Sequence, residues 1–295
     1  MGHPGKKKLY WGAVILYGVV LLGVLLYLRF PETTFRQYCE FQVEKVFPQV
    51  DCTIAGVSFG FPAQLVFEEI RFELENPEKT LLLQDPQLEV SPLWKHFGNM
   101  FFLRSRAYGG SHTVEIGIDA ENNRIEITQF VIKNIDLEQV PFLEEKFDRT
   151  ARGIFSGSGS AVLRLEGFTV IEAQGNGSIK NGEIGLKNPI LGLKNLEIES
   201  GSADFAVNAQ NISLRKGEVN SRKIKADFQG NISLAGTLFA GDITVKGSLI
   251  PLQPLTQENR RLKLFITGLQ KKHRSNAIPF RIGGTLGKPA FVFVQ

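Results

Sequence analysis

Apolar and polar residues alternate with a period of two along much of the chain from about Thr53 onward. Successive side chains of a β-strand point to opposite faces, so this alternation is typical of half-buried antiparallel strands. The pattern predicts a mainly β protein, built on a curved, largely antiparallel sheet with a few short helices. We interpret one set of alternating positions as a candidate apolar groove face: Ile70, Phe72, Leu74, Phe205, Val207, Phe228, Ile232, Ile243 and Val245.

Glycine, asparagine and proline separate these segments and predict hairpin turns. The expected turns include Gly109-Gly110, Glu121-Asn122-Asn123, Gly175-Asn176-Gly177, Asn181-Gly182, Gly201-Ser202 and Lys216-Gly217. A sheet with one apolar face must bury it. Two packed sheets, a closed barrel, or one long sheet curled around a ligand would each do so, and periodicity does not choose among them. In the curled sheet, lipid tails or another protein's apolar segment would fill the groove.

The stretch from Leu9 to Leu28 contains no charged residue. At about 1.5 Å per helical residue it is long enough to cross about 30 Å of hydrocarbon. Lysines at positions 6–8 precede it, which favours a cytoplasmic N-terminus, and no small-x-small cleavage site follows it. We therefore predict an inner-membrane protein with a cytoplasmic tail at 1–8, a single span at 9–28, a juxtamembrane helix at 29–50 and a periplasmic β-rich domain at 51–295.

Three further segments have helical rather than strand periodicity. Thr33 to Phe47 carries a broad apolar face and is followed by Pro48, which ends a helix. Asp136 is placed to cap a helix running to about Asp148, and Leu255 to Leu269 has apolar residues at helical spacing. These segments account for the short helices expected beside the sheet.

Composition and charge narrow the range of functions. The net charge is +4 with no run of five like charges, so we expect no nucleic-acid partner. The densest basic patch, from Lys271 to Arg274, is interpreted either as a solvated loop or as a contact with anionic headgroups. The two cysteines, Cys39 and Cys52, are either a disulfide or two separate thiols, since an exported pair can oxidise.

No pattern of catalytic, cofactor-binding or metal-ligating residues emerges, so we expect a non-enzyme without a cofactor. The four histidines, His3, His96, His112 and His273, are scattered along the chain. The stretch from Gly283 to Lys288 is similar to a phosphate-binding loop only superficially. Ile282 stands where the first glycine belongs and Pro289 where Ser or Thr would meet magnesium, so we interpret this stretch as a hairpin.

The same C-terminal stretch, Ile278 to Val292, resembles the closing hairpin of the AsmA-like family, in which a pattern of the form pf-x-i-x-G-t-l-x-x-P recurs. The basic tail, the anchor, the short helix and the strands at 57–62 and 65–74 also match this layout. A chain of this length and layout is similar to the GspN family of bacterial type II secretion systems. The resemblance implies an accessory inner-membrane component that contacts other secretion proteins, or alternatively a lipid-binding or lipid-transfer module using an apolar β-groove for phospholipid. It supplies no catalytic residues.

Overall fold

The computed structural model describes residues 4–46, 50–60, 64–74, 80–90, 100–140, 143, 150–166, 169–191, 193–208, 210–233, 241–258, 260–285 and 288–294. Two helices, α1 (Pro4–Leu28) and α2 (Glu32–Val46), come first. The strands that follow are β1 (Val50–Ile54), β2 (Val57–Gly60), β3 (Gln64–Phe67), β4 (Glu69–Leu74), β5 (Thr80–Val90), β6 (Met100–Ala107), β7 (Gly110–Asp119) and β8 (Arg124–Asp136).

After a short 3₁₀ helix, η2 (Leu137–Gln139), the strands continue as β9 (Ala151–Arg164), β10 (Val170–Ile190), β11 (Leu193–Asn208), β12 (Asn211–Asn220), β13 (Ile224–Ser233) and β14 (Ile243–Pro251). Helices α4 (Gln253–Glu258) and α5 (Arg260–His273) precede the last two strands, β15 (Ile278–Gly284) and β16 (Pro289–Phe293).

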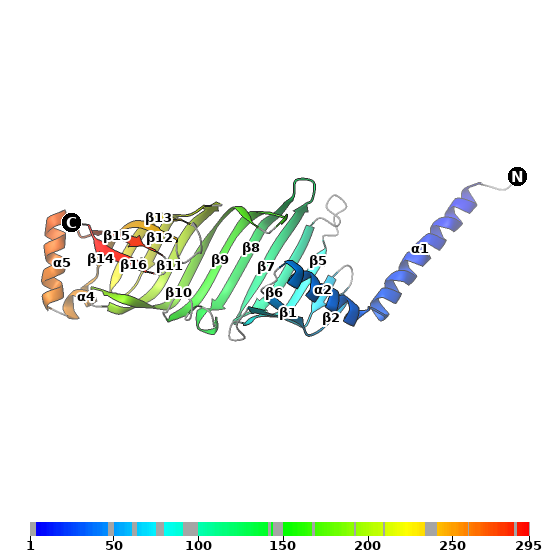
Figure 1. Ribbon diagram of the computed structural model, residues 1–295, viewed down its shortest axis with the longest axis horizontal. Helices are drawn as coiled ribbons and strands as arrows, with labels where there is room; N and C mark the ends of the chain where they lie inside the picture. The colour runs from blue at the N-terminus through cyan, green and yellow to red at the C-terminus, as the bar shows by residue number, and fades with distance from the viewer. Residues whose placement is uncertain are drawn as a thin grey trace.

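All sixteen of these strands belong to one sheet, whose main path runs from β1 through β4 and then in chain order to β16 (Figure 1). The short strands β2 and β3 pair with each other, and β3 also pairs with β5. Every pairing between these strands is antiparallel, and most join neighbours in sequence. The predicted mainly β, antiparallel architecture is therefore confirmed, and the described strands form a single continuous sheet.

The predicted helices have mixed outcomes. The helix at Thr33–Phe47 is confirmed as α2, and the one at Leu255–Leu269 corresponds to α4 and α5 together. Asp136 does cap a helix, because its Oδ1 accepts a hydrogen bond from the Glu138 N–H at 3.1 Å, but that helix is only η2. Residues 141–142 and 144–149 lie outside the described residues, so the rest of this prediction has no test.

The segment predicted as a membrane span falls within α1, which Figure 1 shows projecting from the sheet. Within the residues that the structure describes, no helix meets the length and hydropathy required to cross a membrane. In α1 the structure describes the side chains of residues 11, 12 and 14–25, and every large apolar one among them is exposed. The membrane span itself stays a prediction.

Several of the predicted turns are wrong. Gly175-Asn176-Gly177 and Asn181-Gly182 lie inside β10, Gly201-Ser202 lies inside β11, and Lys216-Gly217 lies inside β12. The strands are correspondingly longer than the turn spacing suggested. At Asn181 the chain takes a φ of 49° and the pairing with β9 shifts register, which is a bulge rather than a reversal of direction. The turns at Gly109 and at residues 121–123 are confirmed.

Helix α2 packs on the N-terminal end of the sheet. Phe35, Cys39 and Val43 of α2 contact a buried cluster formed by Cys52, Ile54, Val57 and Phe67. A hydrogen bond from the Ile54 N–H to Glu40 Oε1 at 2.9 Å ties the helix to β1. Both cysteines are free thiols, so the alternative of two separate thiols describes this structure.

The C-terminal end has its own core beneath α4 and α5. Leu255, Ile266 and Ile278 are almost completely buried there, with Leu193 from the start of β11. Phe291 and Phe293 of β16 pack on the same cluster although β12 to β15 lie between β11 and β16 in the sheet. The sheet therefore curves so that both strands and α5 surround one core, and Figure 1 shows α5 at the opposite end of the molecule from α1.

Candidate functional site: the apolar face of the sheet

Three rows of paired residues cross one face of the sheet. Residues directly opposite each other on antiparallel strands project to the same face, so the register identifies each row. The first row spans β6 to β14 and is apolar at every position: Phe101, Ile116, Ile127, Ala161, Ala173, Val207, Ile212, Ile232 and Ile243. We call the face that carries this row the apolar face.

A second row lies two residues from the first on each strand that both rows cross, except on β8, where a bulge makes the spacing three residues. It contains only apolar residues and glycines: Leu65, Leu88, Leu103, Val114, Phe130, Gly159, Gly175, Phe205, Leu214, Gly230, Val245, Ile282 and Phe291. A third row continues the pattern with Ile132, Gly157, Gly177, Ala203, Gly217, Phe228, Gly247, Phe280 and Phe293. The apolar face is thus continuous across most of the sheet.

The register places six of the nine predicted groove residues on this face. Val207, Ile232 and Ile243 belong to the first row, Phe205 and Val245 to the second, and Phe228 to the third. Ile70 and Phe72 of β4 pack on the same cluster as Leu65 and Leu88, which belong to the second row. Leu74 ends β4 and pairs with Val50 of β1. Their sharing a face is a property of the register; their role as a groove stays a prediction.

Glycines on the apolar face lie beneath phenylalanine rings of neighbouring strands. A Cβ placed on any of five glycines would come within 3.1 Å of a ring carbon; the pairs are Gly159 with Phe130, Gly175 with Phe205, Gly177 with Phe155, Gly217 with Phe228 and Gly247 with Phe280. Four of these pairs are also directly opposite in register. The glycines therefore make room for aromatic rings within strands, which is why the turn predictions at Gly175 and Gly217 fail.

Sequence reasoning missed this pairing. The sequence nevertheless contains a signal for this pairing. Gly157 and Gly159 alternate with Ser156, Ser158 and Ser160, and Gly175 and Gly177 flank Asn176 in the same way. In each case the glycines fall at the alternate positions that apolar residues occupy elsewhere in the same strand. A glycine at such an alternate position indicates the interior of a strand, where a large side chain of the neighbouring strand lies over it, rather than a turn.

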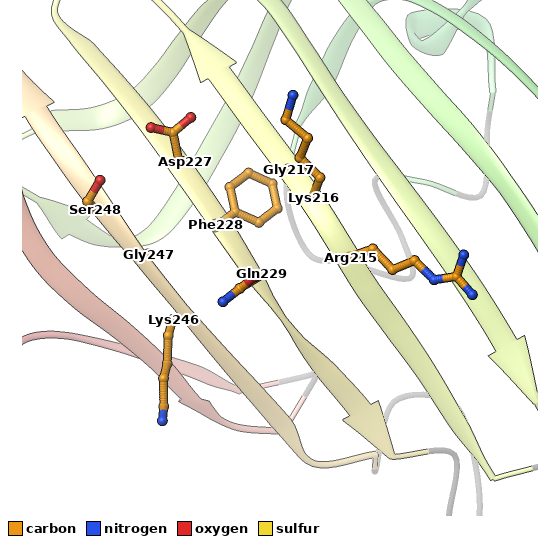
Figure 2. A pocket seen from close by; sticks show the side chains of 9 residues that line it. All are labelled: Arg215, Lys216, Gly217, Asp227, Phe228, Gln229, Lys246, Gly247 and Ser248. Carbon is orange, nitrogen blue, oxygen red and sulfur yellow. The ribbon is translucent and has the colours of Figure 1, made fainter.

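The opposite face is polar and hollowed. A depression of about 610 Å³ crosses β8 to β12. Its lining includes the polar residues Glu126, Glu172, Asn208 and Arg215, together with Ile127, Ala161, Ala173 and Val207 of the first row. Another, of about 440 Å³, lies over β12 to β14, where Figure 2 shows the polar side chains of Arg215, Lys216, Asp227, Gln229, Lys246 and Ser248. The same view shows the Phe228 ring turned toward β12, where Gly217 lies. Charge is thus concentrated on one face of the sheet.

Two polar residues interrupt the apolar face near the β6–β7 turn. Ser105 is buried and lies directly opposite His112, which in turn lies opposite Ile132. The Nε2 atom of His112 is buried without a hydrogen-bond partner among the described residues. Burial therefore lowers the pKa of His112, because desolvation disfavours the charged imidazolium.

The described residues contain no group of three or more His, Cys, Asp or Glu side chains that could hold a metal ion. Burial raises the pKa of the Cys52 thiol to about 11 and also raises that of Cys39, so neither is an activated nucleophile. In the basic patch from Lys271 to Arg274, the first three residues form the last turn of α5 rather than a loop, and the alternative of a contact with anionic headgroups stays a prediction.

Comparison of the chain with protein-family models, curated proteins and solved structures finds no match. The family resemblance therefore rests on the motifs quoted above. The C-terminal motif falls on β15 and β16, which pair from Phe280 with Phe293 to Gly284 with Pro289. The interpretation of the stretch from Gly283 to Lys288 as a hairpin is therefore confirmed.

Proposed function

We propose that this chain is a membrane-anchored, non-catalytic lipid-binding protein whose apolar sheet face receives acyl chains. The observation that carries the proposal is the first row, in which nine consecutive strands each contribute an apolar residue. Helix α2 packs at one end of the sheet and α4 and α5 at the other, with the short η2 beside β9, while central members of the row such as Ile116, Ile127 and Ala173 are only half-buried. An apolar ligand on this central region would remove that surface from water.

The anchor is part of the same proposal. Helix α1 exposes large apolar side chains around its circumference, including Trp11, Ile15, Leu16 and Val19, each more than 60% exposed. A helix with apolar side chains on all sides suits a hydrocarbon environment better than water. With lysines at positions 6–8 on the cytoplasmic side, the sheet would lie in the periplasm of a Gram-negative cell.

Adjacent phenylalanines allow a matched test of the lipid proposal. Phe101 lies on the apolar face opposite Ile116, whereas Phe102 faces the other side opposite Glu115. Each is replaced in turn by the photoreactive analogue benzoyl-phenylalanine in the full chain, reconstituted in vesicles of phosphatidylethanolamine and phosphatidylglycerol. Irradiation followed by mass spectrometry should show phospholipid adducts for position 101 and few for position 102. Equal adduct yields at the two positions would contradict the proposal.

The resemblance to type II secretion components supports a second proposal, an accessory role in that secretion machinery. It is favoured by the order of elements, in which an anchor helix and a short second helix precede the sheet and a matching hairpin closes it. Both roles are compatible in one protein. Gene neighbourhood is the simplest test: the secretion role requires adjacency to secretion genes, and consistent separation from them would remove this support.

A further inference from the structure

The apolar face ends in an open hollow of about 510 Å³ between α5, the end of β10 and β16. Its lining includes Ile190 at the end of β10, Leu191 directly after that strand, Phe265 from α5, and Phe291 from β16. Arg261 contributes the only charge among the described residues that line it. Such a site, apolar with one placed polar group, is typical of small-molecule binding.

This hollow is continuous with the apolar face. Phe291 lies opposite Ile282, which lies opposite Val245 of the second row. The walls are aromatic, because the ring centroids of Phe265 and Phe293 are 6.1 Å apart and those of Phe291 and Phe293 are 5.0 Å apart. An acyl chain lying on the second row would therefore meet this hollow where the row ends.

Charge on α5 favours an anionic ligand. The helix contains Arg260, Arg261, Lys263, Lys271 and Lys272 and has no acidic residue in its sequence. Phe265 is 51% exposed at the hollow, so the rim offers apolar contact beside the Arg261 guanidinium. Arginine presents a planar set of N–H donors that suits carboxylate and phosphate oxygens.

We propose that this hollow binds a single acyl chain that carries an anionic headgroup. The chain would pack against Phe265, Phe291 and Phe293, and the headgroup oxygens would accept hydrogen bonds from Arg261. The inference rests on the proposed lipid function and adds to it a defined site and a headgroup charge. A fatty-acid carboxylate and the phosphate of an anionic lysophospholipid share this chemistry.

The first test uses palmitate bearing a diazirine, with the full chain in detergent. Irradiation and peptide mapping should place the label on α5 and β16. Ile190→Trp, which fills the hollow, should reduce this labelling at least about tenfold, whereas Val292→Trp should retain it. Val292 is 53% exposed and alternates with Phe291 and Phe293 on β16, so the control adds the same ring to the other face.

The second test addresses the headgroup. Arg261→Gln should weaken palmitate binding about tenfold, the effect of losing one charge-assisted contact, while binding of hexadecanol changes less than about twofold. Competition with lysophosphatidylglycerol and with lysophosphatidylcholine then distinguishes a fatty-acid carboxylate from a lysophospholipid phosphate as the headgroup that binds. If only palmitate competes, the ligand is a fatty acid; if lysophosphatidylglycerol also competes and the choline lipid does not, the site accepts anionic headgroups generally.

Failure of this site is distinguishable from failure of the lipid function. If Ile190→Trp leaves the labelling unchanged, or the label maps elsewhere, while position 101 still forms phospholipid adducts, the hollow is wrong and the face remains supported. If position 101 also forms none, both proposals are overturned. Should Ile190→Trp lose its β-sheet circular dichroism, Phe265→Gln at the exposed rim replaces it, with the same expected loss of labelling.

Discussion

Gly217 and Phe228 provide a direct energetic test of the glycine–phenylalanine pairing. A Cβ at Gly217 would overlap the Phe228 ring, and the three nearest atoms all belong to that ring rather than to backbone. Gly217→Ala therefore forces one side chain to move in a packed site, which typically costs about 1–3 kcal/mol. Removing a glycine from a strand returns about 0.5–1 kcal/mol, so the net loss should be about 1–2 kcal/mol.

The interaction energy between Gly217→Ala and Phe228→Ala tests the pairing more sharply than either single substitution does. Phe228→Ala alone should cost about 2 kcal/mol, since Phe228 is only half-buried. In that background Gly217→Ala has no ring to displace, so its cost should vanish or become a small gain. The double-mutant cycle should then give an interaction energy of about 1–3 kcal/mol in magnitude.

Thermal unfolding of the full chain in detergent, followed by circular dichroism, measures these differences. A loss of 1 kcal/mol corresponds to about 2–4 °C in a chain of this size. Gly283→Ala is the matched control, because a Cβ there meets only the Ile243 carbonyl oxygen at 4.0 Å; its midpoint should change little. If Gly217→Ala is equally destabilising with and without the Phe228 ring, steric pairing is not the reason for the glycine.

Three further outcomes follow from the described contacts. Since burial lowers the pKa of His112, the unfolded state binds its proton first, so stability should fall as pH drops below about 6.5; thermal melts across pH should show a flatter curve for His112→Asn. Cys52, with its pKa near 11, should resist maleimide at neutral pH longer than partly exposed Cys39; quantitative labelling of Cys52 in the folded protein would contradict its burial. Arg222→Ala should change the melting midpoint by less than about 2 °C, because the Arg222–Glu199 pair, at 3.4 Å, is largely exposed.

The period-two alternation predicted the class of fold and the shared face because it depends only on local geometry. Once strands are antiparallel and paired in register, residues of one parity, such as Phe205 and Val207, must project to the same side. The alternation could not show that the strands form one sheet, because sandwich, barrel and single sheet place equal demands on each strand. That outcome depends on how β5 to β14 pair in sequence and how the ends are covered.

The failed turns have a different cause. Gly175 and Gly217 have the composition of turns, and local propensity alone assigns them so. Their role depends on Phe205 and Phe228, which reach them only through pairing between strands. The terminal hollow was equally inaccessible to sequence reasoning, because residues 189–191 and β16 meet only when the sheet curves around α5.

The arrangement of the two ends also bears on where an acyl chain could enter. At the end nearest α1, α2 covers the apolar face, and Ile54 and Val57 beneath it are only 3% exposed. A chain entering along the strands there would have to displace Phe35 and Val43 from a packed cluster, losing about 1.5–3 kcal/mol for each side chain exposed. The half-buried central rows require no such displacement. Under the proposed lipid function, entry from the side of the sheet beyond α2 is therefore favoured over entry directly beside α1, and the proposed site beneath α5 would be the far end of that path.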